Sequence, residues 1–87
     1  ITDEGKIMLI VVDGRMKEAA GMTLKEFAST LQWLNAKIML NLDGGGSSTL
    51  FINKENYGVI NHPTDNGKYD HAGERKVANV LLLFLNK

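Results

Sequence analysis

This sequence has little or none of four features: cysteine, proline, long apolar segments and an excess of charge of one sign. It has no cysteine, which excludes disulfides and thiolate zinc sites, and it has one proline, Pro63. The longest apolar run, residues 80–85, is far shorter than the roughly 20 residues that cross a bilayer as a helix, so we expect no membrane span. Ten basic residues balance ten acidic ones and no basic run occurs. The sequence therefore lacks the electrostatic footprint of a nucleic-acid-binding protein.

What is present is typical of a globular domain. The 87 residues suffice for one domain but are few for a self-sufficient core. Hydrophobic residues make up 44% and charged residues 23%, which argues against disorder. The sequence opens at Ile1 with neither an initiator methionine nor a signal peptide. We therefore expect a piece of a longer protein, processed or cut, whose active site needs residues from elsewhere.

Hydrophobic periodicity predicts one helix. Thr23 and Glu26 form a Thr-x-x-Glu capping box, the usual start of a helix. Apolar residues then recur at three- and four-residue spacing as far as Leu34, which gives the helix one apolar face. Asn35 is the expected end.

Short apolar segments bounded by turn residues predict strands. Residues 6–12 and 38–42 end at Asp-Gly pairs, and residues 77–85 are apolar on both faces, as in a central strand. Residues 49–52 and 57–60 are expected to pair as a hairpin. The predicted fold class is α/β (α+β), a mixed sheet of about five strands with one helix, as an incomplete part of a larger domain. Because one helix cannot cover both faces of such a sheet, the remaining cover is expected from missing sequence or another chain.

The most informative stretch is the run Asn41-Leu42-Asp43-Gly44-Gly45-Gly46-Ser47-Ser48-Thr49. Adjacent glycines are used where the chain needs positive φ angles or a close approach of its backbone. Asp43 would then project into a cleft, with the glycine N–H groups and the following hydroxyls available to a sugar or phosphate. An ordinary turn between two strands is the alternative. The lysine and the following helix of a nucleotide P-loop are both missing.

Asp13-Gly14-Arg15 ends the first predicted strand in the same way. By itself, this tripeptide favours a turn with an exposed arginine. If the two strands were parallel neighbours, however, Asp13 and Asp43 would lie at one edge of the sheet, where ligands of α/β units gather. Paired carboxylates are what glycoside cleavage uses. With Asp65, the same carboxylates are candidates for holding a hard cation, although the sequence contains no ligand loop.

A long polar loop, residues 62–74, precedes Arg75. Loops of this length are often functional in small domains. Arg75 offers a planar donor suited to phosphate or carboxylate, and a salt bridge to a loop acid is the alternative. His62 and His71 do not lie in a metal-ligand pattern, so we expect surface histidines.

Several motifs together resemble the phosphodiester glycosidase family. They occur in order over nearly the whole chain: Asp13-Gly14-Arg15, Gly21-Met22-Thr23-Leu24-x-Glu26, the run 41–49, Asn61-x-Pro63-Thr64-Asp65 and Arg75-x-Val77. The family includes an enzyme that removes N-acetylglucosamine from a phosphodiester to expose mannose 6-phosphate. The resemblance implies that the chain is the C-terminal part of a longer domain.

The resemblance also implies an activity, hydrolysis of the bond between a sugar anomeric carbon and a phosphodiester. Its implied catalytic residues are Asp43, Asp13 and Arg75, with Asp43 or Asp13 as nucleophile or base. The implied substrate-binding residues are Asn41, Gly44, Gly45, Gly46, Ser47, Ser48, Thr49, Arg15 and Asp65, and the cofactor is unknown.

The expected partners are a glycan or sugar-phosphate substrate and the N-terminal half of the domain, with a second chain as one way of supplying that half. The family resemblance favours an extracytoplasmic or cell-envelope location. The alternative function is a non-catalytic carbohydrate- or phosphate-binding module, or a structural module of a cell-envelope or virion assembly. The chain by itself is expected to be inactive.

Overall fold

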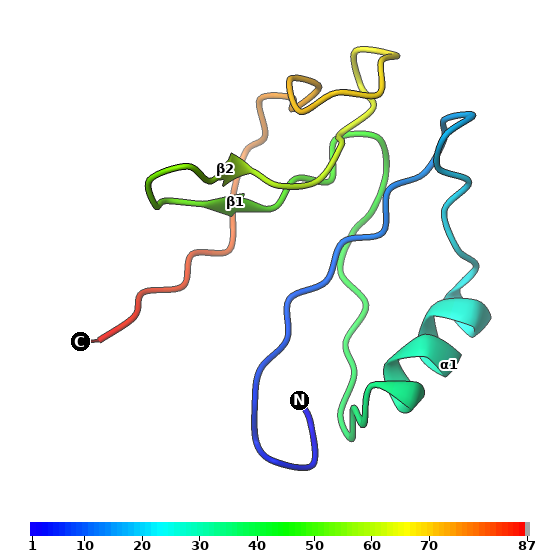
Figure 1. The fold of residues 1–87 in the computed structure, drawn as a ribbon, viewed down its shortest axis with the longest axis vertical. Helices are drawn as coiled ribbons and strands as arrows, with labels where there is room; N and C mark the ends of the chain where they lie inside the picture. The colour runs from blue at the N-terminus through cyan, green and yellow to red at the C-terminus, as the bar shows by residue number, and fades with distance from the viewer. Residues whose placement is uncertain (87) are drawn as a thin grey trace.

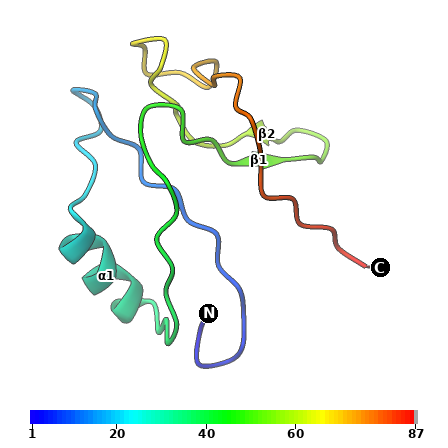
Figure 2. The same cartoon turned by 180° about the vertical axis from the view of Figure 1, so that it is seen from behind.

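The computed structural model describes residues 1–86, which form one helix and a small hairpin joined by long extended segments (Figure 1). Seen from behind in Figure 2, helix α1 lies apart from the hairpin, and the C-terminal segment runs away from both. The radius of gyration is 14.0 Å. A compact chain of this length would have a radius of about 12 Å. The described residues are therefore looser than a typical domain.

Helix α1 spans Leu24–Trp33 and confirms the helix prediction. The Thr23 hydroxyl accepts a hydrogen bond from the Glu26 N–H at 3.2 Å, and the Glu26 carboxylate accepts one from the Thr23 N–H at 2.8 Å. This capping box satisfies two backbone donors at the helix start. Leu34 is the C-cap, and Asn35 follows with a φ of 63°. Since a left-handed residue cannot continue an α-helix, Asn35 ends it where the sequence indicated.

Strands β1 (Phe51–Ile52) and β2 (Gly58–Val59) pair antiparallel and confirm the predicted hairpin, although both are shorter than expected. Phe51 lies opposite Val59, and Ile52 lies opposite Gly58. The Ile60 N–H donates to the Leu50 carbonyl at 2.9 Å, which continues the pairing toward the loop that follows β2.

The prediction of a mixed sheet of about five strands is wrong. Residues 1–86 contain only the two-stranded sheet of β1 and β2, and segments 6–12, 38–42 and 77–85 are not strands. A strand exists only where its N–H and C=O groups pair with a neighbour. Outside that sheet, residues 1–86 contain two isolated antiparallel bridges, between Thr2 and Ala36 and between Met16 and Ala19.

The described residues have no apolar core. None of the hydrophobic side chains in residues 1–86 is buried, whereas Asn61 and Pro63 are. Three of the most exposed apolar residues, Leu40, Phe84 and Leu85, lie on segments 38–42 and 77–85 and are 83%, 85% and 90% exposed, and Trp33 on α1 is 79% exposed. Apolar side chains exposed in this number would lose contact with water only through further burial. No helix in residues 1–86 is long and apolar enough to cross a membrane.

Candidate active site

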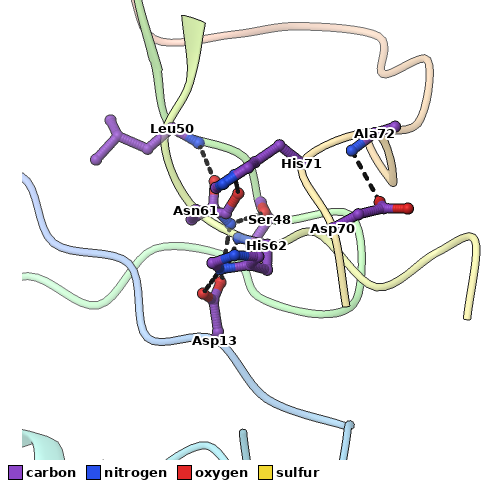
Figure 3. A network of polar contacts seen from close by, with 8 residues as sticks. All are labelled: Asp13, Ser48, Leu50, Asn61, His62, Asp70, His71 and Ala72. Atoms are coloured by element: carbon purple, nitrogen blue, oxygen red, sulfur yellow. Dashed lines mark hydrogen bonds and ion pairs between the residues drawn. The ribbon is translucent and has the colours of Figure 1, made fainter. Parts of the chain in front are cut away.

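A buried asparagine joins three segments that are distant in sequence. Asn61 directly follows the hairpin and is 7% exposed. Its Oδ1 accepts from the Leu50 N–H at 2.8 Å, and its Nδ2 donates to the Ser48 carbonyl at 2.7 Å and to Asp13 Oδ1 at 3.2 Å. An N–H faces one end of the amide and a carbonyl faces the other, so only one amide orientation satisfies both. We call these residues, with His62 and His71, the Asn61 network (Figure 3).

Asp13 is held from several sides within this network. Its Oδ1 also accepts from the His62 N–H at 2.9 Å, and its Oδ2 lies 2.8 Å from His62 Nδ1. The side chains of His62 and Asp13 are 24% and 20% exposed. Burial raises the pKa of Asp13, but the hydrogen bonds from His62 and Asn61 outweigh it and lower the pKa below its ordinary value of 3.8. Asp13 is therefore an anion at neutral pH.

Three rings stack beside this carboxylate. The His62 ring stacks on Tyr69, with centroids 4.1 Å apart, and on His71, with centroids 4.2 Å apart. His71 Nδ1 lies 2.7 Å from the Asn61 carbonyl oxygen, so His71 is also tied to the Asn61 network. The preference for surface histidines missed this arrangement, because the Asp13–His62 contact joins residues 49 positions apart.

The glycine run shows both features expected of it, a positive φ angle and a close approach of its backbone to another segment. Gly45 has a φ of 115°, and its carbonyl accepts from the Ser48 N–H at 3.1 Å to close a turn. A Cβ on Gly46 would lie 2.8 Å from Asp65 Oδ1, because the Gly46 carbonyl accepts from the N–H groups of Thr64 and Asp65. Gly44 has open space around it. The run thus bends at Gly45 and meets the long loop at Gly46.

Arg75 connects the glycine run to the long loop. Its Nη2 donates to Ser47 Oγ at 3.0 Å, and its Nη1 lies 3.2 Å from Asp65 Oδ2. The Arg75 side chain is 62% exposed, so the remaining guanidinium N–H groups face solvent. Both uses considered for Arg75 coexist here, a salt bridge to a loop acid and a donor available to an anion.

An open hollow lies beside this arginine. Asp43 lines it without an ion pair to Arg75, because Asp43 Oδ1 accepts from the adjacent Gly44 N–H at 3.0 Å. Ser48 also lines the hollow, and its carbonyl is bound by Asn61 from behind. The full lining is Asp43, Gly44, Ser47, Ser48, Arg75, Lys76, Val77, Ala78 and Asn79.

The other candidate residues lie around this hollow or away from it. Asp13 belongs to the Asn61 network and not to the lining, so the expected pair of carboxylates on one sheet edge, which required two neighbouring strands, does not form. Arg15 and Asn41 are exposed outside the lining, and Arg15 has a φ of 60°. Thr49 donates to the Ser47 carbonyl at 2.9 Å. Among residues 1–86, no three His, Asp or Glu side chains gather closely enough to hold a metal ion, so the cation site considered for Asp13, Asp43 and Asp65 does not form.

Comparison with known proteins identifies the family. A model of the phosphodiester glycosidase family matches residues 1–84. The chain belongs to the phosphodiester glycosidase family. No curated protein and no solved structure matches the chain. The resemblance seen in the motifs is confirmed, and the family name gives the activity at its coarsest level, cleavage of glycosidic bonds by a phosphodiester glycosidase.

The family match over residues 1–84 includes the glycine run, the Asn61 network and Arg75. Asn61 was present in the motif Asn61-x-Pro63-Thr64-Asp65 but was not expected to act in the site. The sequence did hold one sign of it, since Asn61 lies two residues before the only proline and directly before the long loop, where an asparagine is suited to binding backbone groups. Nothing in the sequence linked His62 or Tyr69 to Asp13.

Proposed function

We propose that this chain supplies part of an active site that hydrolyses a sugar-1-phosphodiester at the bond between the anomeric carbon and the phosphate oxygen. Family membership supports the reaction class. The observation that carries the proposal for this chain is the hollow where Arg75, hydrogen-bonded to Ser47, lies beside Asp43. It combines a cation, a hydroxyl and a carboxylate, the groups that such a substrate needs.

Arg75 and the glycine run bind the phosphate in this proposal. A guanidinium donates two parallel hydrogen bonds to phosphate oxygens, and its pairing with Asp65 and Ser47 fixes the plane of the fork. The hydroxyls of Ser47 and Ser48, which also line the hollow, add donors beside the guanidinium. The candidates Gly45, Gly46 and Thr49 shape this loop, whereas Asn41 and Arg15 are proposed to contact substrate from outside the hollow.

Asp43 acts on the sugar. A glycosidic bond breaks through an oxocarbenium-like transition state, which a carboxylate stabilises as nucleophile, base or counter-charge. Asp43 lines the hollow, whereas both oxygens of Asp13 are engaged by the Asn61 network. We therefore assign the direct role to Asp43 and make Asp13 a positioning residue. A phosphate is a good leaving group, so strong acid assistance to its departure is unnecessary.

The rest of the site is proposed to come from the N-terminal half of the domain, on the same chain or on a second one. Segments 6–12, 38–42 and 77–85 expose most of their apolar side chains, and their backbone belongs to no sheet. Strands of a completing half would pair with this backbone and cover both faces, as in buried parallel sheets. N-acetylglucosamine is our first choice of sugar, from the family.

The test is turnover of a chromogenic sugar-1-phosphodiester by the complete protein and by its Asp43→Asn variant. We expect Asp43→Asn to lower kcat by about 10²–10⁴, the usual contribution of a positioned acid–base group. Arg75→Lys should lower kcat/KM while the protein stays folded, because lysine keeps the charge and loses the fork. The matched controls are Asp3→Asn and Lys25→Met, which lie outside the hollow. Wild-type turnover by Asp43→Asn would contradict its role, and substrate binding without product would favour a binding module.

A further inference from the structure

We propose that His62 is a proton-transfer residue of this site, whose Nε2 accepts the proton of the attacking water while Asp13 positions the ring. The inference rests on the proposed hydrolysis of a sugar-1-phosphodiester and deepens it. Its basis is the contact between His62 and Asp13 together with the ring stack of Tyr69, His62 and His71.

The contact with Asp13 selects one tautomer of His62. The Asp13 carboxylate is ionised and can only accept, so His62 Nδ1, 2.8 Å from Oδ2, carries the hydrogen. In the neutral imidazole the second nitrogen, Nε2, is then without a proton and has a free lone pair. This is the protonation state that a general base needs. If Nε2 takes up a proton, the adjacent carboxylate stabilises the imidazolium.

The His62 ring is held in place and remains partly exposed to solvent. Tyr69 and His71 each stack on it, with interplanar angles of 15° and 30°, which restricts its rotation. The backbone N–H of His62 binds the same carboxylate as its ring does. About a quarter of the His62 side chain remains exposed, so water reaches part of the ring. The charged and titratable groups that face His62 are Asp13, His71 and Tyr69.

Residues 61–65 connect His62 directly to the hollow. On one side of His62, Asn61 binds the Ser48 carbonyl behind the hollow. On the other side, Thr64 and Asp65 bind the Gly46 carbonyl, and Asp65 pairs with Arg75. The imidazole and the guanidinium are therefore anchored to opposite ends of one short segment of the long loop. This segment fixes the separation between the group that handles the proton and the group that binds the phosphate.

The proposed step balances in protons and electrons. The water oxygen bonds to the anomeric carbon while one water proton moves to His62 Nε2. The bond between that carbon and the phosphate oxygen breaks, and its electron pair leaves with the phosphate. The imidazolium then gives its proton to the departing phosphate monoester or to solvent. Asp43 stabilises the positive charge on the sugar during the step.

The first test is the pH dependence of kcat in the complete protein on a chromogenic sugar-1-phosphodiester. The wild type should lose activity on the acid side, because a protonated Nε2 cannot accept the proton of the attacking water. His62→Gln should lower kcat by about 10²–10⁴ and remove this acid limb. Asp13→Asn should lower kcat less than His62→Gln does, because the ring keeps its Nε2 lone pair and loses only the group that positions it. Lys25→Met, which lies outside both the hollow and the Asn61 network, is the control and should keep the limb.

The second test does not depend on activity. Nitrogen NMR of the His62 side chain should show the tautomer protonated on Nδ1 in the wild type. This preference should weaken in Asp13→Asn. A wild-type ring protonated on Nε2, or a His62→Gln variant with the wild-type pH profile, would overturn the role of His62. Absence of turnover by the wild-type complete protein would instead overturn the proposed function, while the tautomer measurement still tests the positioning by Asp13.

Discussion

The Asn61 network and the extended apolar segments are opposite kinds of structure within one short chain. In the network, each polar atom of the Asn61 amide has a partner, and Asp13, Ser48 and Leu50 are joined across more than thirty positions of sequence. In the segments 6–12, 38–42 and 77–85, apolar side chains are exposed and the backbone belongs to no sheet. The polar groups of the network are thus satisfied within the chain, whereas the apolar side chains of the extended segments stay exposed.

The two regions differ because hydrogen bonding and apolar burial need different numbers of neighbouring groups. A hydrogen-bonded network needs only a few groups in the right geometry, and each bond contributes on the order of 1 kcal/mol. An apolar strand gains stability only when neighbours remove its surface from water. Residues 1–86 supply the first condition at Asn61 and do not supply the second anywhere.

The largest effect on stability is expected in the extended apolar segments. In the complete protein, Leu82→Asp should lower the free energy of unfolding by about 3–5 kcal/mol, because a covered strand would hold an uncompensated charge. Leu82 is 66% exposed in the residues described here. Urea unfolding monitored by circular dichroism measures the change, with Lys54→Asp in the hairpin turn as the matched control. An unchanged midpoint for Leu82→Asp would show that segment 77–85 stays uncovered in the complete protein. That result would contradict the expectation that further strands cover it.

A smaller effect is expected at the centre of the network. Asn61→Ala removes three hydrogen bonds from a buried amide and should cost about 2–3 kcal/mol in the complete protein. The same unfolding measurement applies, with Asn53→Ala in the exposed turn as control. Equal stability of the two variants would mean that Asn61 does not join the segments in the complete protein.

The smallest effect concerns pH. The folded-state pKa of Asp13 is lowered, so its contribution to stability is present in full above pH 3.8 and is lost as the pH falls through the folded-state pKa. Asp13→Asn should therefore cost about 1 kcal/mol at pH 7, the scale of one ordinary hydrogen bond, because the asparagine side chain still has an acceptor oxygen. The difference between wild type and variant should shrink on going from pH 7 to pH 3. A difference that stays constant over this range would show that ionisation of Asp13 does not support the network.

Local patterns in the sequence predicted the local structure well. The capping box at Thr23 and Glu26 placed helix α1, and Asn35 ended it, because a cap involves residues three positions apart. The hairpin of β1 and β2 was predicted for the same reason. The about five-stranded sheet was not found, since alternation and apolar runs indicate that a segment suits a strand but not that a partner strand is present.

The candidate site also has one part that neighbouring residues in the sequence predict and another part that only long-range contacts define. The sequence by itself determined that Asp43, the glycines and the hydroxyls lie on one loop, because they are consecutive, and its motifs determined the family. Only the tertiary structure decided that Asp13 is bound to His62 and Asn61 and that Arg75 lies on Ser47 and Asp65. These contacts join residues 10 to 49 positions apart. No local preference encodes them, because hydrogen bonds across such separations form only after the chain has brought its loops together.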